Sequence, residues 1–198
     1  SAQVVSGDSS WDRSLAALLC RLGSLRWLDL SFIPIRPSSV LGGALSSLAD
    51  LRTLRLSSTC LRDEDLEGLT GLGSLRELDL SLTALGDPGM AHLGEMSGLR
   101  ALDLRDTAVT DLGIPDVARL QELRLLLLGQ GPTELGLRWL DGLKTLEGLG
   151  VDSRASSARG HSRLTGLRGL WWAGEGRAVQ STDPRSSLDG AHSTCAGH

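Results

Sequence analysis

Residues 75–80 of the chain read Leu-Arg-Glu-Leu-Asp-Leu, and the same L-x-x-L-x-L block recurs at residues 51–56 and 99–104. Degenerate copies begin at Leu25, Leu123, Leu146 and Leu167. The seven copies are spaced by 26, 24, 24, 24, 23 and 21 residues. A sequence period of about 20–50 residues is typical of solenoids, so we expect the chain to fold as stacked copies of one unit.

Each unit has a strand half and a helix half. Three leucines at alternating positions predict a short strand with one buried face. The apolar residues that follow return every three to four positions, which is helical spacing. The complete copies also share a ninth-position threonine and an aspartate four residues later, at Thr59 and Asp63, Thr83 and Asp87, and Thr107 and Asp111.

These shared polar residues suggest two local roles. We expect the threonine hydroxyl to bond the backbone of the turn that leaves the strand. We expect Asp87 and Asp111 to begin helices, because a carboxylate there accepts the N–H groups that the first helical turn leaves without partners. Pro88 after Asp87 suits the first helical turn.

The pattern resembles the leucine-rich-repeat family over about residues 11–175. The family resemblance implies an α/β solenoid, with a curved parallel sheet on the concave side and short helices on the convex side. With threonine at the ninth position, the frame is similar to the cysteine-containing or F-box-type repeats and to protozoan or bacterial repeats. We expect a flexible arm over residues 1–10, a repeat domain over residues 11–177 and a disordered tail over residues 178–198, where periodicity is absent.

Composition agrees with one repeat domain and limits the kind of partner. The chain has 198 residues, of which 43 are leucine, and a net charge of −4. This acidity argues against nucleic acid as the main ligand. Cys20, Cys60 and Cys195 show neither zinc-site spacing nor a disulfide framework. Without the cysteine-rich caps of extracellular relatives, we expect an intracellular, cytoplasmic setting, and an organellar one stays open because the chain starts at Ser1.

Neither catalysis nor membrane insertion is indicated. His92, His161, His192 and His198 have no Ser, Cys or carboxylate partner at a motif spacing. The glycine-rich segment 129–136 lacks the G-K-[ST] ending of a phosphate-binding loop. No apolar run approaches the roughly 20 residues that cross a bilayer. We therefore expect a protein that is not an enzyme and has no cofactor or metal.

Function is expected on the concave face, where the third, fifth and seventh positions of each block point outward. In the strand 123–128, this rule exposes Leu125 and Leu127 beside glycines that would leave hollows, and then Trp171. Leucine and tryptophan gathered on one surface have the composition of an interaction hot spot. Two alternatives stay open: the C-terminal tail folds back over this patch, or the decayed repeat frame turns these residues inward.

The N-terminal half of the same face offers a second group of candidates. Trp27, Phe32 and Leu82 occupy nominally exposed positions. Arg55 lies between Asp29 and Asp79 in the fifth-position column, where neighbouring strands about 4.8 Å apart can build an alternating ladder of charges. The ladder is either part of a binding surface or a self-neutralised, solvated strip.

Arginine fills most of the second-position column, at the entry to the strands. These residues are Arg26, Arg52, Arg76, Arg100, Arg124 and Arg168, interrupted by Glu147. Such a rim can meet an acidic protein or RNA phosphates, because guanidinium pairs well with both. Alternatively, each arginine pairs with an aspartate of its own or the next unit.

The sequence therefore predicts a non-catalytic protein-interaction module that serves as an adaptor or scaffold subunit of a larger intracellular assembly. Two other roles stay open. The first is the substrate-recognition part of a ubiquitin ligase, which the repeat subtype suggests and which would need an F-box-like helical segment before Ser1. The second is an RNA-contacting subunit of a ribonucleoprotein complex, which would use the arginine rim.

Overall fold

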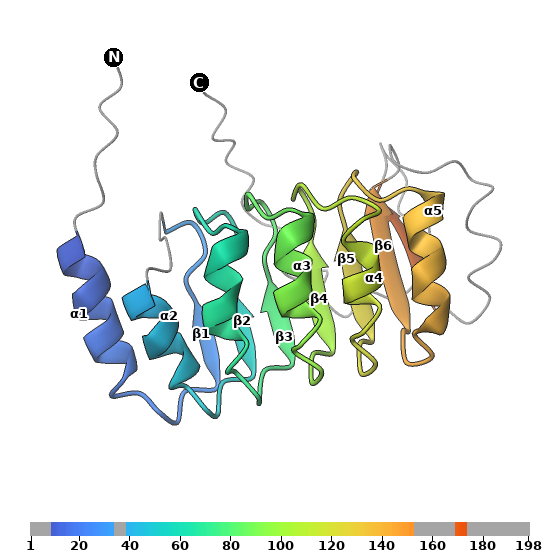
Figure 1. The fold of residues 1–198 in the computed structure, drawn as a ribbon. Coiled ribbons are helices and arrows are strands. Elements are labelled where there is room, and N and C mark those ends of the chain that lie inside the picture. Colours follow the sequence, from blue (N-terminus) through green and yellow to red (C-terminus); the bar gives the residue numbers. More distant parts are fainter. Residues whose placement is uncertain (1–8, 34–38, 153–168, 174–198) are drawn as a thin grey trace, which may run out of the picture.

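The computed structural model describes residues 9–33, 39–152 and 169–173, and side chains are described for most of these residues. Strands and helices alternate along the chain to form a solenoid (Figure 1). The strands are β1 (Trp27–Asp29), β2 (Thr53–Arg55), β3 (Glu77–Asp79), β4 (Ala101–Leu104), β5 (Leu125–Leu128), β6 (Gly148–Asp152) and β7 (Gly169–Ala173). The helices are α1 (Ser9–Leu19), α2 (Ser39–Ser46), α3 (Asp87–Leu93), α4 (Ile114–Val117) and α5 (Glu134–Leu137), with 3-10 helices η1 (Asp63–Leu69) and η2 (Arg138–Gly142).

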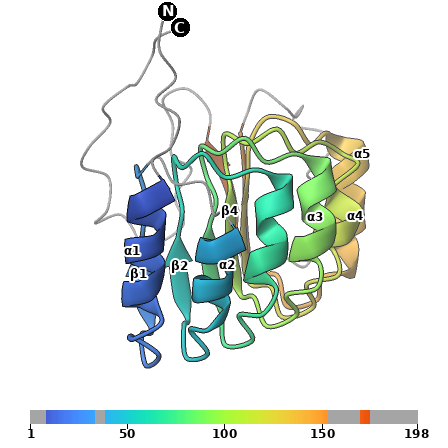
Figure 2. The same cartoon turned by 60° about the vertical axis from the view of Figure 1, so that its left-hand side comes forward.

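The strands form one parallel sheet in which each pairs with the next in sequence order, from β1 to β7. The register is in phase with the repeat, so that Leu54, Leu78, Leu102 and Leu126 lie side by side. The helices all cover the same side of the sheet (Figure 2). The predicted leucine-rich-repeat solenoid is thereby confirmed. Each strand begins two residues after the leucine that opens its block.

Leucine burial drives the stacking. The first, fourth and sixth positions of the complete units point between sheet and helices, and Leu75, Leu78 and Leu80 are almost fully buried. Burying one such side chain contributes about 1.5–3 kcal/mol relative to leaving it exposed. At the N-terminal end of the array, Leu25 and Leu28 are only partly buried, because β1 pairs with a described strand on one side only.

The ninth-position threonines close the turn after each strand, as predicted. The hydroxyls of Thr59, Thr83 and Thr107 donate to the carbonyl oxygens three residues earlier, over 2.7, 2.6 and 2.7 Å. Thr59 and Thr83 are buried. These hydroxyls therefore serve the fold by satisfying a strand-end carbonyl.

The expectation for the aspartates is confirmed only in part, because α3 begins at Asp87 with Pro88 in its first turn, but the carboxylates do not cap their own helices. The helix caps of α3 and α4 are Gly86 and Gly113, and neither α3 nor α4 has a side-chain cap. The Asp63 carboxylate instead accepts the Gly86 N–H of the next unit over 2.8 Å. Asp87 and Asp111 reach in the same way into the units that follow them. The aspartates therefore join units to one another.

The first helix also differs from expectation. α1 begins at Ser9, inside the segment expected as an arm. Leu19 is buried, whereas Leu18 on the helix and Leu22 after it are exposed. α1 packs against α2 on one side, and Leu22 lies beyond its last turn, so a single stripe of the helix is covered.

Candidate functional site

The concave face is the side of the sheet opposite the helices. In the described strands β1 to β6, its third- and fifth-position residues are Trp27 and Asp29, Thr53 and Arg55, Glu77 and Asp79, Ala101 and Asp103, Leu125 and Leu127, and Gly148 and Gly150. The seventh position does not follow the expected rule in two units. Ser57 and Ser81 are buried there, with their hydroxyl oxygens 2.9 Å apart.

At the N-terminal end of this face, three predicted residues meet. The Arg55 guanidinium lies 3.8 Å from the Asp29 carboxylate. The same guanidinium lies 5.9 Å from the centroid of the exposed Trp27 ring, within the range of a cation–π contact. Arg55 is therefore held by its neighbours on β1.

The rest of the predicted charge ladder is not a chain of ion pairs. Asp79 lies next to Arg55 in register, yet its Oδ1 accepts the N–H and the hydroxyl of Ser81 over 3.0 and 2.7 Å. The neighbour of Asp79 on its other side is a second carboxylate, that of Asp103. Like charges directly opposite one another on adjacent strands are destabilising.

Arg105 partly offsets this repulsion. Its guanidinium binds Asp103 through two nitrogens, with the shorter contact at 2.8 Å. The pKa of Arg105 is raised above its ordinary value by the hydrogen bond to Asp103, and further by the charges of Asp103, Asp79 and Asp106. The carboxylates therefore set the local potential around β3 and β4.

The C-terminal half of the concave face is apolar. Leu126 and Leu128 are buried, and Leu125 and Leu127 between them are partly exposed on the opposite side of β5. The hollow expected at Gly150 is filled, because a Cβ added there would lie 2.6 Å from Cδ2 of Leu127. Leu127 thus lies across the backbone of β6 and makes a flat apolar floor.

Phe32 and Leu82 lie at the ends of their strands and are 71% and 52% exposed. Both have a positive φ, of 63° and 56°, as do Ser58 and Asp106 at the same position of their units. Each of Phe32 and Leu82 donates its N–H to the next unit, over 2.8 and 2.9 Å. Bulky side chains rarely adopt this left-handed conformation, so two large apolar residues are held outward at a cost.

Two predicted residues lie wholly or partly outside the described structure. Trp171 belongs to β7 and pairs in register with Gly150, but its side chain is not among the described ones. Arg168 lies outside the described residues.

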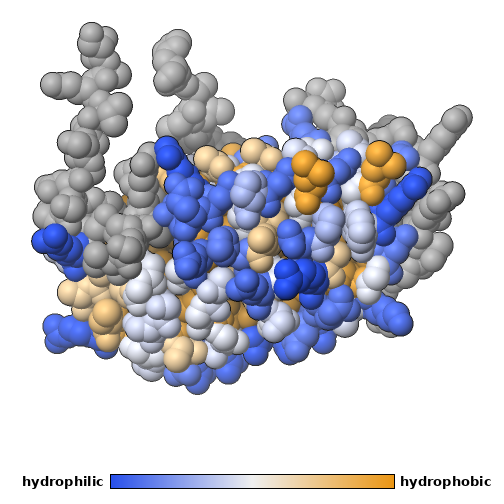
Figure 3. All heavy atoms as spheres, viewed as in Figure 1, coloured by the Kyte–Doolittle hydropathy of each residue, from blue (hydrophilic) through white to orange (hydrophobic). Residues whose placement is uncertain are grey.

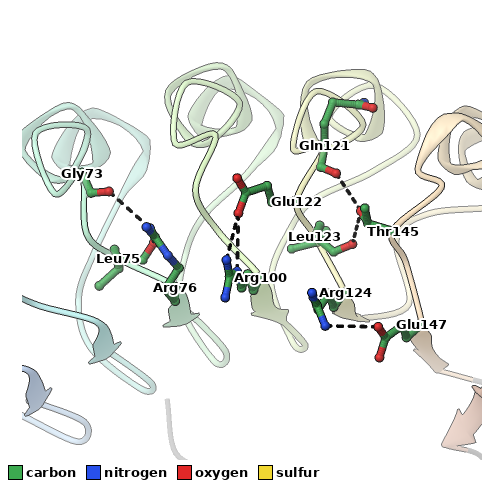
Figure 4. Close-up of polar contacts among 10 residues, drawn as sticks. All are labelled: Gly73, Leu75, Arg76, Arg100, Gln121, Glu122, Leu123, Arg124, Thr145 and Glu147. Carbon is green, nitrogen blue, oxygen red and sulfur yellow. Dashed lines mark hydrogen bonds and ion pairs between the residues drawn. The ribbon is translucent and has the colours of Figure 1, made fainter.

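Arg76, Arg100 and Arg124 of the arginine rim are engaged within the protein (Figure 4). Arg76 donates to the carbonyl oxygens of Gly73 and Leu75 over 3.2 and 2.9 Å. Arg100 pairs with Glu122, and Arg124 with Glu147, each at 3.4 Å. The partners are carbonyl oxygens and glutamates, not the aspartates considered from the sequence. Arg26 and Arg52 at the start of the rim have exposed side chains.

Comparison with known proteins agrees with this geometry. The model of the leucine-rich-repeat family matches residues 74–94, which span strand β3 and helix α3. Over these residues the chain is similar to the leucine-rich-repeat family. No curated protein matches its sequence.

A solved structure shows the same fold. The leucine-rich-repeat array is similar to an internalin from Listeria monocytogenes, with a TM-score of 0.53 and 16% sequence identity. The match covers 77% of this chain and 55% of the internalin chain, so the chain spans about half of that structure. At this identity the similarity concerns the fold.

An apolar group that was not predicted from the sequence lies on the convex side of the repeats. Leu112 and Leu135 occupy the same position in neighbouring units and are 79% and 65% exposed, and Trp139 follows on η2. Figure 3 shows strongly apolar spots over the upper ends of α4 and α5. Aligning Thr110-Asp-Leu-Gly113 with Thr133-Glu-Leu-Gly136 would have revealed the repeated leucine.

Two features are absent from the described residues. They contain no group of three or more His, Cys, Asp or Glu side chains that could hold a metal ion. Among them there is also no helix long and apolar enough to cross a membrane. Leucine-rich repeats typically act as non-catalytic interaction modules.

Proposed function

We propose that this protein is an adaptor or scaffold subunit of an intracellular assembly and that it binds a protein partner through the concave face. The observation that carries the proposal is the apolar floor formed by Leu125 and Leu127. The preceding units place Glu77 and Asp79, then Ala101 and Asp103, at the same two positions.

The change from carboxylates to leucines along this face suits a surface that binds another protein. A solvated strand face gains nothing from two leucines, whereas a partner that covers them removes their apolar surface from water. Neither side chain is needed to fill the core, since Leu126 and Leu128 already do so on the other face. The exposed side chains of Trp27, Phe32 and Leu82 would extend the contact toward the first units.

The arginine rim gives weaker support to an RNA-binding role. Arg100 and Arg124 are about half exposed, which leaves part of each guanidinium accessible. A phosphate would have to compete with Glu122 and Glu147, and both carboxylates would repel it. We therefore place the principal contact on the concave face.

The test is affinity capture from the native cells with the full chain, followed by mass spectrometry. The test variant is Leu125→Glu with Leu127→Glu. The matched control is Leu112→Glu with Leu135→Glu, which makes the same change on the convex side. Loss of a discrete set of proteins in the test variant alone supports the proposal. Loss in the control alone would move the interface to the convex side and refute the concave assignment.

Folding and RNA binding are checked in the same experiment. Each variant must unfold in one cooperative transition. If the glutamates prevent folding, a Leu125→Thr, Leu127→Thr pair removes most of the apolar surface and keeps residues that favour strands. A partner lost after nuclease treatment, and lost in an Arg100→Ala, Arg124→Ala variant, would favour the RNA role instead.

A further inference from the structure

The concave face has two chemically different halves, and their order along the array restricts what can bind. The units that contain β1 to β4 are charged on this face. Their carboxylates are those of Asp29, Glu77, Asp79 and Asp103, and their guanidiniums are those of Arg55 and Arg105. The units that contain β5 and β6 have leucine and glycine there instead. A partner that covers the whole face must therefore meet negative charge at one end and an apolar floor at the other.

Asp79 is the carboxylate best placed to receive a cation. Its Oδ1 is fixed by the N–H and the hydroxyl of Ser81, so the carboxylate is already oriented. Among the described residues, Oδ2 of Asp79 has no hydrogen bond, whereas both oxygens of Asp103 bind Arg105. Asp79 also lies in register with Asp103, and a cation bound between them would relieve the repulsion of this pair.

The apolar half begins two strands away. Strands β3 and β5 are separated by two inter-strand spacings, so Asp79 and Leu127 are about 10 Å apart across the sheet. Leu127 lies over Gly150, and together they offer a flat apolar surface without a charged side chain. An aliphatic or aromatic side chain can lie on this floor while a neighbouring basic side chain reaches Asp79.

We infer that the partner segment carries an arginine or lysine and, about 10 Å from it, a large apolar residue, with the basic residue toward β3 and the apolar residue toward β5 and β6. This inference rests on the proposed function and adds the chemistry and the direction of the bound segment. Charge complementarity favours a basic segment over an acidic one, because an acidic segment would face three carboxylates around Arg105.

The test begins with a random peptide library displayed on phage and selected on the full chain. The selected peptides are synthesised, and their Kd is measured by fluorescence anisotropy against the wild type and three variants. Asp79→Asn removes the charge but keeps the oxygen that accepts from Ser81. Leu127→Glu tests the apolar floor. Asp141→Asn removes an exposed carboxylate on η2 and is the matched control.

We expect the selected peptides to combine a basic residue with a large apolar one. Asp79→Asn should weaken their binding about tenfold, the effect of losing one charged hydrogen bond. Asp141→Asn should leave the Kd unchanged. Asp79→Asn should melt no lower than the wild type, because it relieves the repulsion from Asp103, so the loss of binding cannot be a folding defect.

The other outcomes separate this inference from the proposed function. Peptides that lack basic residues, or whose binding survives Asp79→Asn but not Leu127→Glu, would overturn the inference and leave the concave site in place. Peptides unaffected by both changes would overturn the concave site itself. Failure to recover any peptide would refute a short segment as the partner.

Discussion

The Asp111 carboxylate holds Thr133 of the next unit by two bonds, one to its N–H and one to its hydroxyl, both 2.6 Å long. Asp87 binds the N–H and the hydroxyl of Thr110 in the same way, over 2.7 and 2.6 Å. These contacts couple each unit to the next on the helix side of the array. The strand ladder does the same on the sheet side, so a unit is fixed at both of its faces.

Removing one of these carboxylates should loosen the array. We expect Asp111→Ala to lower the free energy of unfolding by about 1–2 kcal/mol, because it leaves two donors of Thr133 and the N–H of Gly136 without their acceptor. Chemical denaturation measures the change. Asp141→Ala is the control and should stay within about 0.5 kcal/mol of the wild type. Equal effects of the two substitutions would contradict the coupling role.

The core register predicts a second contrast. Leu102 is buried in the middle of the stack, so Leu102→Asp places an unpaired charge in an apolar environment and should abolish cooperative thermal unfolding. Two residues earlier, Arg100→Ala removes only an exposed pair with Glu122 and should cost at most about 1 kcal/mol. If both variants melted alike in calorimetry, the assignment of inside and outside would be wrong.

The left-handed position of Leu82 predicts a gain in stability. Leu82→Asn should raise the free energy of unfolding by about 0.5–1 kcal/mol, because asparagine tolerates a φ of 56° better than leucine does. Leu112→Asn makes the same change at an exposed residue whose φ is not positive, and it should leave stability unchanged. Denaturant midpoints compare the two. A loss of stability in Leu82→Asn would show that the side chain contributes more by packing than its conformation costs.

Two glycines predict opposite effects of adding a methyl group. A Cβ on Gly131 would overlap the carbonyl oxygen of Val109 in the preceding unit, so Gly131→Ala should destabilise the protein by about 2–3 kcal/mol. Gly142 has open space around it, and Gly142→Ala should be neutral or stabilise by up to about 1 kcal/mol. The melting temperatures of the two variants test this contrast. If Gly131→Ala melted like the wild type, the turn that contains Gly131 would be able to shift.

The repeat pattern was enough to predict the sheet and its register. Positions that recur in every unit share one environment, so the buried leucines, the threonine bond and the orientation of Leu125 and Leu127 all followed from the period. The direction of the aspartates did not follow. The pattern within one repeat shows that an aspartate lies near a turn. It does not show that the carboxylate binds the turn of the next repeat.

Features that belong to one place in the array were also missed. The exposure of Leu18 depends on how many neighbours α1 has, which the periodicity does not record. Arg124 pairs with Glu147 of its own column, but the partner of Arg100 is Glu122, which lies outside that column, so the column does not predict the pair. Leu112 and Leu135 lie near helix starts, outside the strand positions whose outward direction the period predicts.

The contact of each aspartate with the unit that follows has an evolutionary consequence. Excising residues 75–98 would bring Asp63 to the place of Asp87, opposite Thr110, whose N–H and hydroxyl already suit a carboxylate. Duplicating the same stretch would create one more junction of the kind already present. Recombination between units can thus lengthen or shorten the array without inventing new chemistry at the seam, while the composition of each strand face remains free to diverge.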